Sequence, residues 1–103
     1  MILYQGQPGT VNSSALFTAD RRITSYTILA ANMAGTGATF RINHCVKGAT
    51  EVTTNIVVPD LAVPAHQIIA IDLPIELRIG DVLRGLQGTV GAITITIDGT
   101  DGT

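Results

Sequence analysis

The chain has 103 residues, of which 46% are hydrophobic and only 14% are charged, and its formal net charge is −2. This length fits one ordinary domain, and the chain lacks the basic patch of a nucleic-acid binder and the ~18-residue apolar run of a membrane span. Because the start, Met1 to Gly9, does not have the pattern of a signal peptide, we expect a protein that is not exported by the usual route. Because Cys45 is the only cysteine, an internal disulfide is excluded, and we expect a soluble domain assembled in the cytoplasm. Because the surface carries few charges, we also expect that partners cover part of it.

Residues 1–10 are predicted to extend from the domain as an N-terminal arm. The segment begins with apolar residues and continues into a stretch with Pro8 and two glycines, which disfavour regular structure. Because apolar side chains are costly to leave in water, we expect the arm to dock on a neighbouring molecule, with fraying as the alternative. The residues predicted to bind this partner are Ile2, Leu3, Tyr4, Gln5 and Pro8.

From residue 11 to residue 98 the apolar residues recur mostly with period two, the period of β-strands. Strands are expected at 15–19, 23–32, 38–44, 53–58, 67–73, 81–87 and 92–98. The segment 23–32 is apolar on both faces, which places it in the centre of a sheet. In the last segment Ile93, Ile95 and Ile97 point to one face and threonines to the other, as in a strand half-buried in a sheet.

Glycines and prolines separate these segments. Pro59, Pro64 and Pro74 are predicted to mark strand ends or edges, because proline cannot donate a hydrogen bond to a sheet. No helix is expected beyond one short turn within 50–55. Short strands at a spacing of about 8–12 residues predict an all-β fold, an antiparallel β-sandwich over residues 11–98 with a jelly-roll or another Greek-key topology.

No catalytic, cofactor-binding or metal-binding site is predicted. His44 and Cys45 are adjacent, so a strand points them to opposite faces and they cannot both bind one metal ion. We expect a packed Cys45 and a solvent-exposed His44. Asp98 and Asp101, at the polar C-terminal tail predicted for 99–103, lack the glutamate that completes a calcium loop. We therefore expect a protein that is not an enzyme and that binds no cofactor, metal or small-molecule substrate.

Four features follow one another along residues 15–98 in an order that is also found in a known group of proteins. They are a strand that ends in Asn32, a Gly-rich loop at 33–37, a Pro-Ala turn at 64–65 and the segment Leu77-Arg-Ile-Gly-Asp-Val-Leu83. In this order the chain resembles the small β-sandwich structural proteins of tailed bacteriophages.

The resemblance implies a virion component. Such domains serve on the head surface as capsid decoration or cement proteins, often homotrimers, which bind the major capsid protein and stabilise contacts between capsomers. The alternative under the same resemblance is a tail, baseplate or fibre component. A carbohydrate-binding module is a further alternative, disfavoured by an aromatic content of 4% without tryptophan, because sugar faces stack on aromatic rings.

Overall fold

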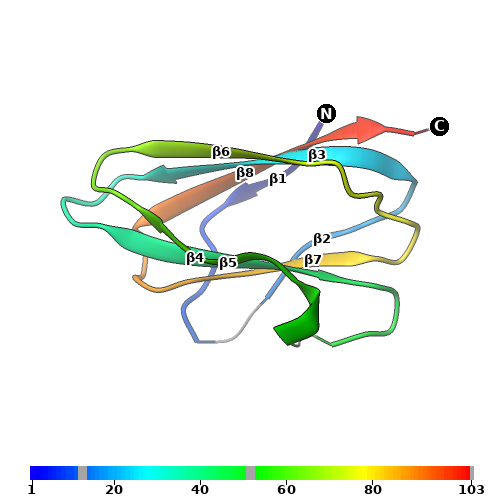
Figure 1. The fold of residues 1–103 in the computed structure, drawn as a ribbon, viewed down its shortest axis with the longest axis horizontal. Helices are drawn as coiled ribbons and strands as arrows, with labels where there is room; N and C mark the ends of the chain where they lie inside the picture. The colour runs from blue at the N-terminus through cyan, green and yellow to red at the C-terminus, as the bar shows by residue number, and fades with distance from the viewer. Residues whose placement is uncertain (12–13, 51–52, 103) are drawn as a thin grey trace.

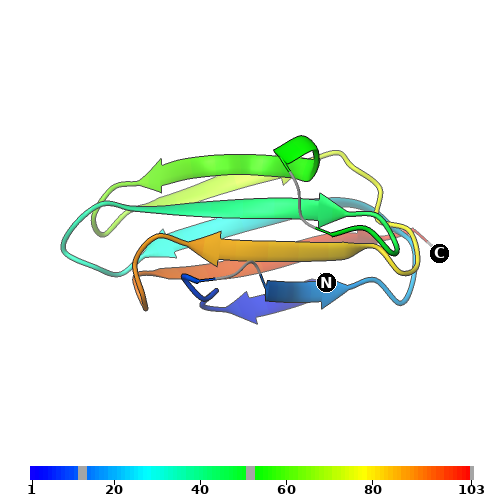
Figure 2. The same ribbon diagram turned by 90° about the horizontal axis from the view of Figure 1, so that it is seen from below.

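Two antiparallel four-stranded sheets stack face to face in the computed structural model, which describes residues 1–11, 14–50 and 53–102 (Figure 1). The strands are β1 (Ile2–Gly6), β2 (Ser14–Thr18), β3 (Ile23–Asn32), β4 (Ala38–Cys45), β5 (Ile56–Val63), β6 (Ile68–Leu73), β7 (Val82–Gln87) and β8 (Ile93–Asp101). The first sheet has the order β1-β8-β3-β6, and the second has the order β2-β7-β4-β5 (Figure 2). The predicted all-β sandwich is confirmed.

The strands pair as if the chain were one long ribbon folded back on itself. β1 pairs with β8, β2 with β7, β3 with β6 and β4 with β5, always antiparallel. Two further antiparallel pairings, β3 with β8 and β4 with β7, join these pairs into the two sheets. Most neighbours in space are therefore distant in sequence.

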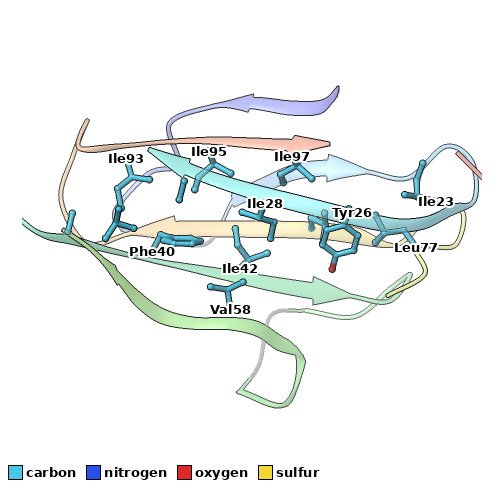
Figure 3. Packing of buried hydrophobic residues seen from close by; sticks show 14 of the residues in the cluster. Ile23, Tyr26, Ile28, Phe40, Ile42, Val58, Leu77, Ile93, Ile95 and Ile97 are labelled. Atoms are coloured by element: carbon cyan, nitrogen blue, oxygen red, sulfur yellow. The ribbon is translucent and has the colours of Figure 1, made fainter. Parts of the chain in front are cut away.

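Inward-facing side chains of both sheets fill the space between them. β8 contributes Ile93, Ile95 and Ile97, and β4 contributes Phe40 and Ile42, all of them buried (Figure 3). Successive side chains of a strand point to opposite faces, so every second residue of β8 and of β4 enters the core. The orientation predicted for the three isoleucines is confirmed.

The central position predicted for 23–32 is also confirmed, because β3 lies between β8 and β6. The strand predicted at 53–58 is displaced. Thr53–Asn55 form a 3-10 turn, and β5 follows it and continues through Pro59. The sheet tolerates this proline because β5 is an edge strand, where one side of the backbone needs no partner strand.

The structure does not confirm the N-terminal arm expected over residues 1–10. Residues 2–6 form β1, an edge strand that pairs with β8 of the same chain. The apolar start of the chain thus packs on its own sandwich. At the other terminus β8 continues to Asp101, through most of the segment expected as a polar tail, because it still pairs there with β3. Residue 103 lies outside the described residues.

Candidate interaction surfaces

The five residues predicted to bind a partner are divided between the surface and the core. Ile2 is 60% exposed and Gln5 is exposed as well. Leu3 and Tyr4 are half-buried against the hydrophobic core, and Pro8 is buried. Only Ile2 and Gln5 therefore present largely exposed side chains, while the other three attach the N-terminal segment to the sandwich.

In each of the two N-terminal edge strands, β1 and β2, a leucine packs against a glycine of the neighbouring strand. A Cβ atom added at Gly99 of β8 would lie 2.6 Å from Leu3 Cδ1, and one added at Gly85 of β7 would lie 2.6 Å from Leu16 Cδ1. Each leucine thus occupies space that any other residue on the neighbouring strand would fill. The absence of a side chain at these two positions lets β1 and β2 pack closely on the sandwich.

The outward face of the first sheet, here called the outer face, has few charges. Its members are Ile2, Gln5, Ser25, Thr27, Leu29, Ala31, Ile68, Ala70, Asp72, Thr94, Thr96, Asp98 and Thr100. The strand register aligns Gln5, Thr96, Leu29 and Ala70 in one row across all four strands. Its charged side chains are Asp72 and Asp98, and Asp98 accepts a hydrogen bond from the N-terminal ammonium group of Met1 at 2.6 Å. The outer face is thus mainly a surface of hydroxyl, amide and aliphatic side chains on an antiparallel sheet.

The outward face of the second sheet is built differently. Arg41 and Asp60 form a two-pronged ion pair across β4 and β5, with Nε–Oδ1 at 3.0 Å and Nη2–Oδ2 at 2.9 Å. The hydrogen bond from Arg41 lowers the pKa of Asp60. Near the end of β4, Asn55 covers Asn43 and Cys45, both of which are buried. Asn43 donates to Asn55 Oδ1 at 2.6 Å, and Asn55 also donates to Cys45 Sγ. Because Cys45 is buried beneath Asn55, the prediction of a packed Cys45 is confirmed.

One end of the sandwich is held by Asp81. Its carboxylate accepts hydrogen bonds from the backbone N–H of Lys47 at 3.1 Å and of Arg78 at 3.0 Å, and it lies 3.2 Å from His44 Nε2. The side chains of His44 and Asp81 are only 10% and 8% exposed. Burial by itself raises the pKa of Asp81, but the hydrogen bonds from Arg78, His44 and Lys47 outweigh it, so the pKa is lowered. The carboxylate therefore connects two loops and a strand.

The prediction of a solvent-exposed His44 is wrong. Its ring lies edge to face with the ring of Tyr26, with centroids 6.4 Å apart, and Tyr26 is itself buried in the core. His44 follows Phe40 and Ile42 at a spacing of two, so β4 directs all three to the same side. Its imidazole can be buried because Asp81 supplies a hydrogen-bond partner.

Neutral amides hold the opposite end of the sandwich. Gln87 donates to the carbonyl oxygens of Pro8 at 2.6 Å and Ile93 at 3.3 Å, and it accepts from Ile93 N–H at 2.8 Å. Asn32 donates to the carbonyl oxygens of Thr36 and Val63, both at 2.9 Å. Both amides are buried, and they provide hydrogen bonds for the backbone of the segments that meet at this end.

Open hollows on the described surface include the following two. One is lined by Ser25, Tyr26, Thr27, Asp72, Leu73 and Pro74, and the other by His44, Val46, Lys47, Glu76, Arg78, Ile79 and Asp81. Within 1–11, 14–50 and 53–102, no three His, Cys, Asp or Glu side chains are grouped as a metal ion would require. No helix in the same ranges has the length and apolar character of a membrane span.

The fold and these surfaces define an all-β, two-sheet antiparallel sandwich. No known protein-family model matches the sequence, and no curated protein or solved structure is significantly similar to the chain.

Proposed function

We propose that the chain is a virion structural protein of a tailed bacteriophage, a capsid decoration or cement protein that binds the major capsid protein on the outer head surface as a homotrimer. The order of segments along residues 15–98 supports this role, because it resembles that of small phage structural domains. In this role the protein carries out no chemistry. It strengthens contacts between capsomers by bridging them.

A jelly-roll topology is part of the proposal. In a jelly roll a chain of eight strands is folded back on itself and rolled up, so that the first strand pairs with the last and the fourth with the fifth. The pairings of β1 with β8, β2 with β7, β3 with β6 and β4 with β5 agree with this scheme. Jelly rolls are common in viral capsid and lectin domains.

The observation that carries the proposal is the low charge of the outer face. The buried centres of protein interfaces are depleted in charged residues, because removing a charge from water is costly. Of the outer-face residues only Asp72 and Asp98 are charged, and Thr27 Oγ1 donates to Asp72 at 2.6 Å. A capsid surface can cover such a face at little desolvation cost, and Ile2 and Gln5 bring β1 into the same contact.

The copy number in purified particles tests the role. Quantitative mass spectrometry of the phage that encodes the chain should give about one copy per major capsid subunit, as a decoration protein covering the head requires. A ratio of a few per cent would contradict the decoration role and place the protein in the tail, baseplate or fibre.

Reattachment to particles stripped of the protein tests the outer face directly. Ile2→Glu adds a charge to this face and should weaken attachment about tenfold, since the new carboxylate loses its water on binding. Val11→Glu is the matched control, because Val11 is an exposed aliphatic residue outside the outer face. Equal attachment of both variants would contradict the proposed contact, and circular dichroism checks that both remain folded.

A further inference from the structure

Two tight turns lie side by side at the end of the sandwich that Asp81 holds. Each of the turns 46–49 and 78–81 is closed by a backbone hydrogen bond of 2.9 Å between its first and last residues. The third residue of each turn is a glycine with positive φ, Gly48 at 83° and Gly80 at 94°, a conformation that other residues rarely adopt. Figure 2 shows both turns at the same end of the molecule, one after β4 and the other before β7.

Asp81 fixes these two turns relative to each other. Its Oδ1 atom accepts a hydrogen bond from the backbone N–H of Lys47, and its Oδ2 atom accepts one from the backbone N–H of Arg78. The side chain of Lys47 lies over Gly80, because a Cβ atom added at Gly80 would lie 2.7 Å from Lys47 Cδ. Lys47 and Arg78 therefore line the hollow at this end from backbone positions that the same carboxylate holds.

This hollow has more hydrogen-bond donors than its own carboxylates can satisfy. Both oxygens of Glu76 already accept, one from Arg78 Nε and the other from Arg22 Nε, and both oxygens of Asp81 are also bonded. Among the described residues, the ammonium group of Lys47 has no hydrogen bond or ion pair, and the 82% exposed side chain of Arg78 donates only through Nε. The ligand that complements these donors is a group with negatively charged oxygens.

Exposed aliphatic side chains flank the same cations. Val46 is 61% exposed and Ile79 is 66% exposed, and both line the hollow beside Lys47 and Arg78. A free inorganic anion would use the donors but would leave both aliphatic side chains in water. A peptide that carries carboxylates and aliphatic side chains satisfies the donors and also covers the apolar surface.

We propose that this hollow binds an acidic segment of a partner protein in which aliphatic side chains alternate with carboxylates. Lys47 and Arg78 pair with the carboxylates, and Val46 and Ile79 pack against the aliphatic side chains. The residues that line the hollow differ from those of the outer face, so this contact goes beyond the proposed capsid contact and does not depend on it.

Titration of the intact chain with three probes tests the site. The first probe is the blocked peptide acetyl-Leu-Asp-Leu-Asp-amide, the second is the same peptide with asparagine in place of both aspartates, and the third is inorganic phosphate. The backbone amide signals of residues 46–49 and 78–81 should shift in NMR spectra as the acidic peptide is added, with a Kd on the order of 1 mM. The asparagine peptide and phosphate should each bind at least about tenfold more weakly.

Matched variants test which cation is responsible. Lys47→Met removes the ammonium group but keeps an unbranched side chain over Gly80, whereas Arg41→Met removes one cation of the second sheet that does not line the hollow. Lys47→Met should weaken binding of the acidic peptide at least about fivefold, and Arg41→Met should change it less than about twofold. Arg78→Gln acts on the same site as Lys47→Met and should also weaken binding. The amide spectra show at the same time that each variant remains folded.

Three results would overturn the inference. The first is the absence of shifts in the signals of the two turns at a peptide concentration about tenfold above the expected Kd. The second is equal binding of the asparagine peptide or of phosphate, which would mean an apolar contact or a site for free anions. The third is equal weakening by Lys47→Met and Arg41→Met, which would mean that only the overall charge of the chain attracts the peptide.

Discussion

The two ends of the sandwich solve the same problem with different chemistry. At both ends a buried polar side chain provides hydrogen bonds for the backbone of nearby loops. Gln87 and Asn32 do this with neutral amides, and Asp81 does it with a carboxylate that also contacts His44. The comparison shows that only the Asp81 end depends on a group that titrates, so acid should act on the two ends unequally.

The largest effect is expected for removal of the carboxylate. Asp81→Ala leaves the part-buried N–H groups of Lys47 and Arg78 without their acceptor and His44 without its partner. Unsatisfied buried groups cost about 1–3 kcal/mol each, so we expect the free energy of unfolding to fall by about 3 kcal/mol. Urea denaturation at neutral pH measures this. A loss below about 1 kcal/mol would mean that the loops rearrange and find water.

Removal of the buried amide of Gln87, at the opposite end, should have a slightly smaller effect. Gln87→Leu keeps the size of the side chain but removes its three hydrogen bonds to Pro8 and Ile93. Because these bonds are neutral, we expect a loss of about 2 kcal/mol in the free energy of unfolding. Gln67→Leu, at an exposed glutamine, is the control and should be close to neutral. If Gln87→Leu costs more than Asp81→Ala, the carboxylate end is not the more strongly held one.

Removal of the Tyr26 hydroxyl group should have the opposite effect and raise the free energy of unfolding. Its hydroxyl group is buried beside His44 and has no hydrogen-bond partner among the described residues, and burial raises its pKa. Tyr26→Phe removes this unsatisfied group while the ring still fills the core, so we expect a gain of about 1 kcal/mol in the free energy of unfolding. Thermal denaturation should show a higher midpoint. A lower midpoint would show that a buried water molecule binds the hydroxyl.

Local patterns predicted the regular parts of this molecule and missed the contacts made at long range. The alternation of Ile93, Ile95 and Ile97 correctly indicated a half-buried strand. The same period of two placed His44 on the inward side after Phe40 and Ile42, but its polarity suggested the surface. The partner that makes its burial tolerable, Asp81, lies 37 residues further along the chain.

The N-terminal segment shows the same limit. The apolar character of Leu3 and Tyr4 indicated that they would be covered, but nothing local indicated by what. The covering strand is β8, near the other terminus, and the space for Leu3 comes from the missing side chain of Gly99. The outer face was missed for the same reason. Which side chains gather on it depends on the strand register, and sequence spacing alone does not reveal this register.

The smallest expected effect is a difference in pH dependence between the two ends. The folded-state pKa of Asp81 lies below its ordinary value, so its carboxylate contributes stability that is complete above about pH 4 and is lost as the pH falls through the folded pKa. Below about pH 4 the free energy of unfolding should therefore fall more for the original chain than for the Asp81→Asn variant. Asp20, Asp60 and Glu76, whose pKa values are also lowered, are present in both proteins, so the difference between the two curves isolates Asp81. Gln87→Leu, which removes no titrating group, should follow a curve parallel to that of the original chain, and a converging curve would mean that acid weakens both ends alike.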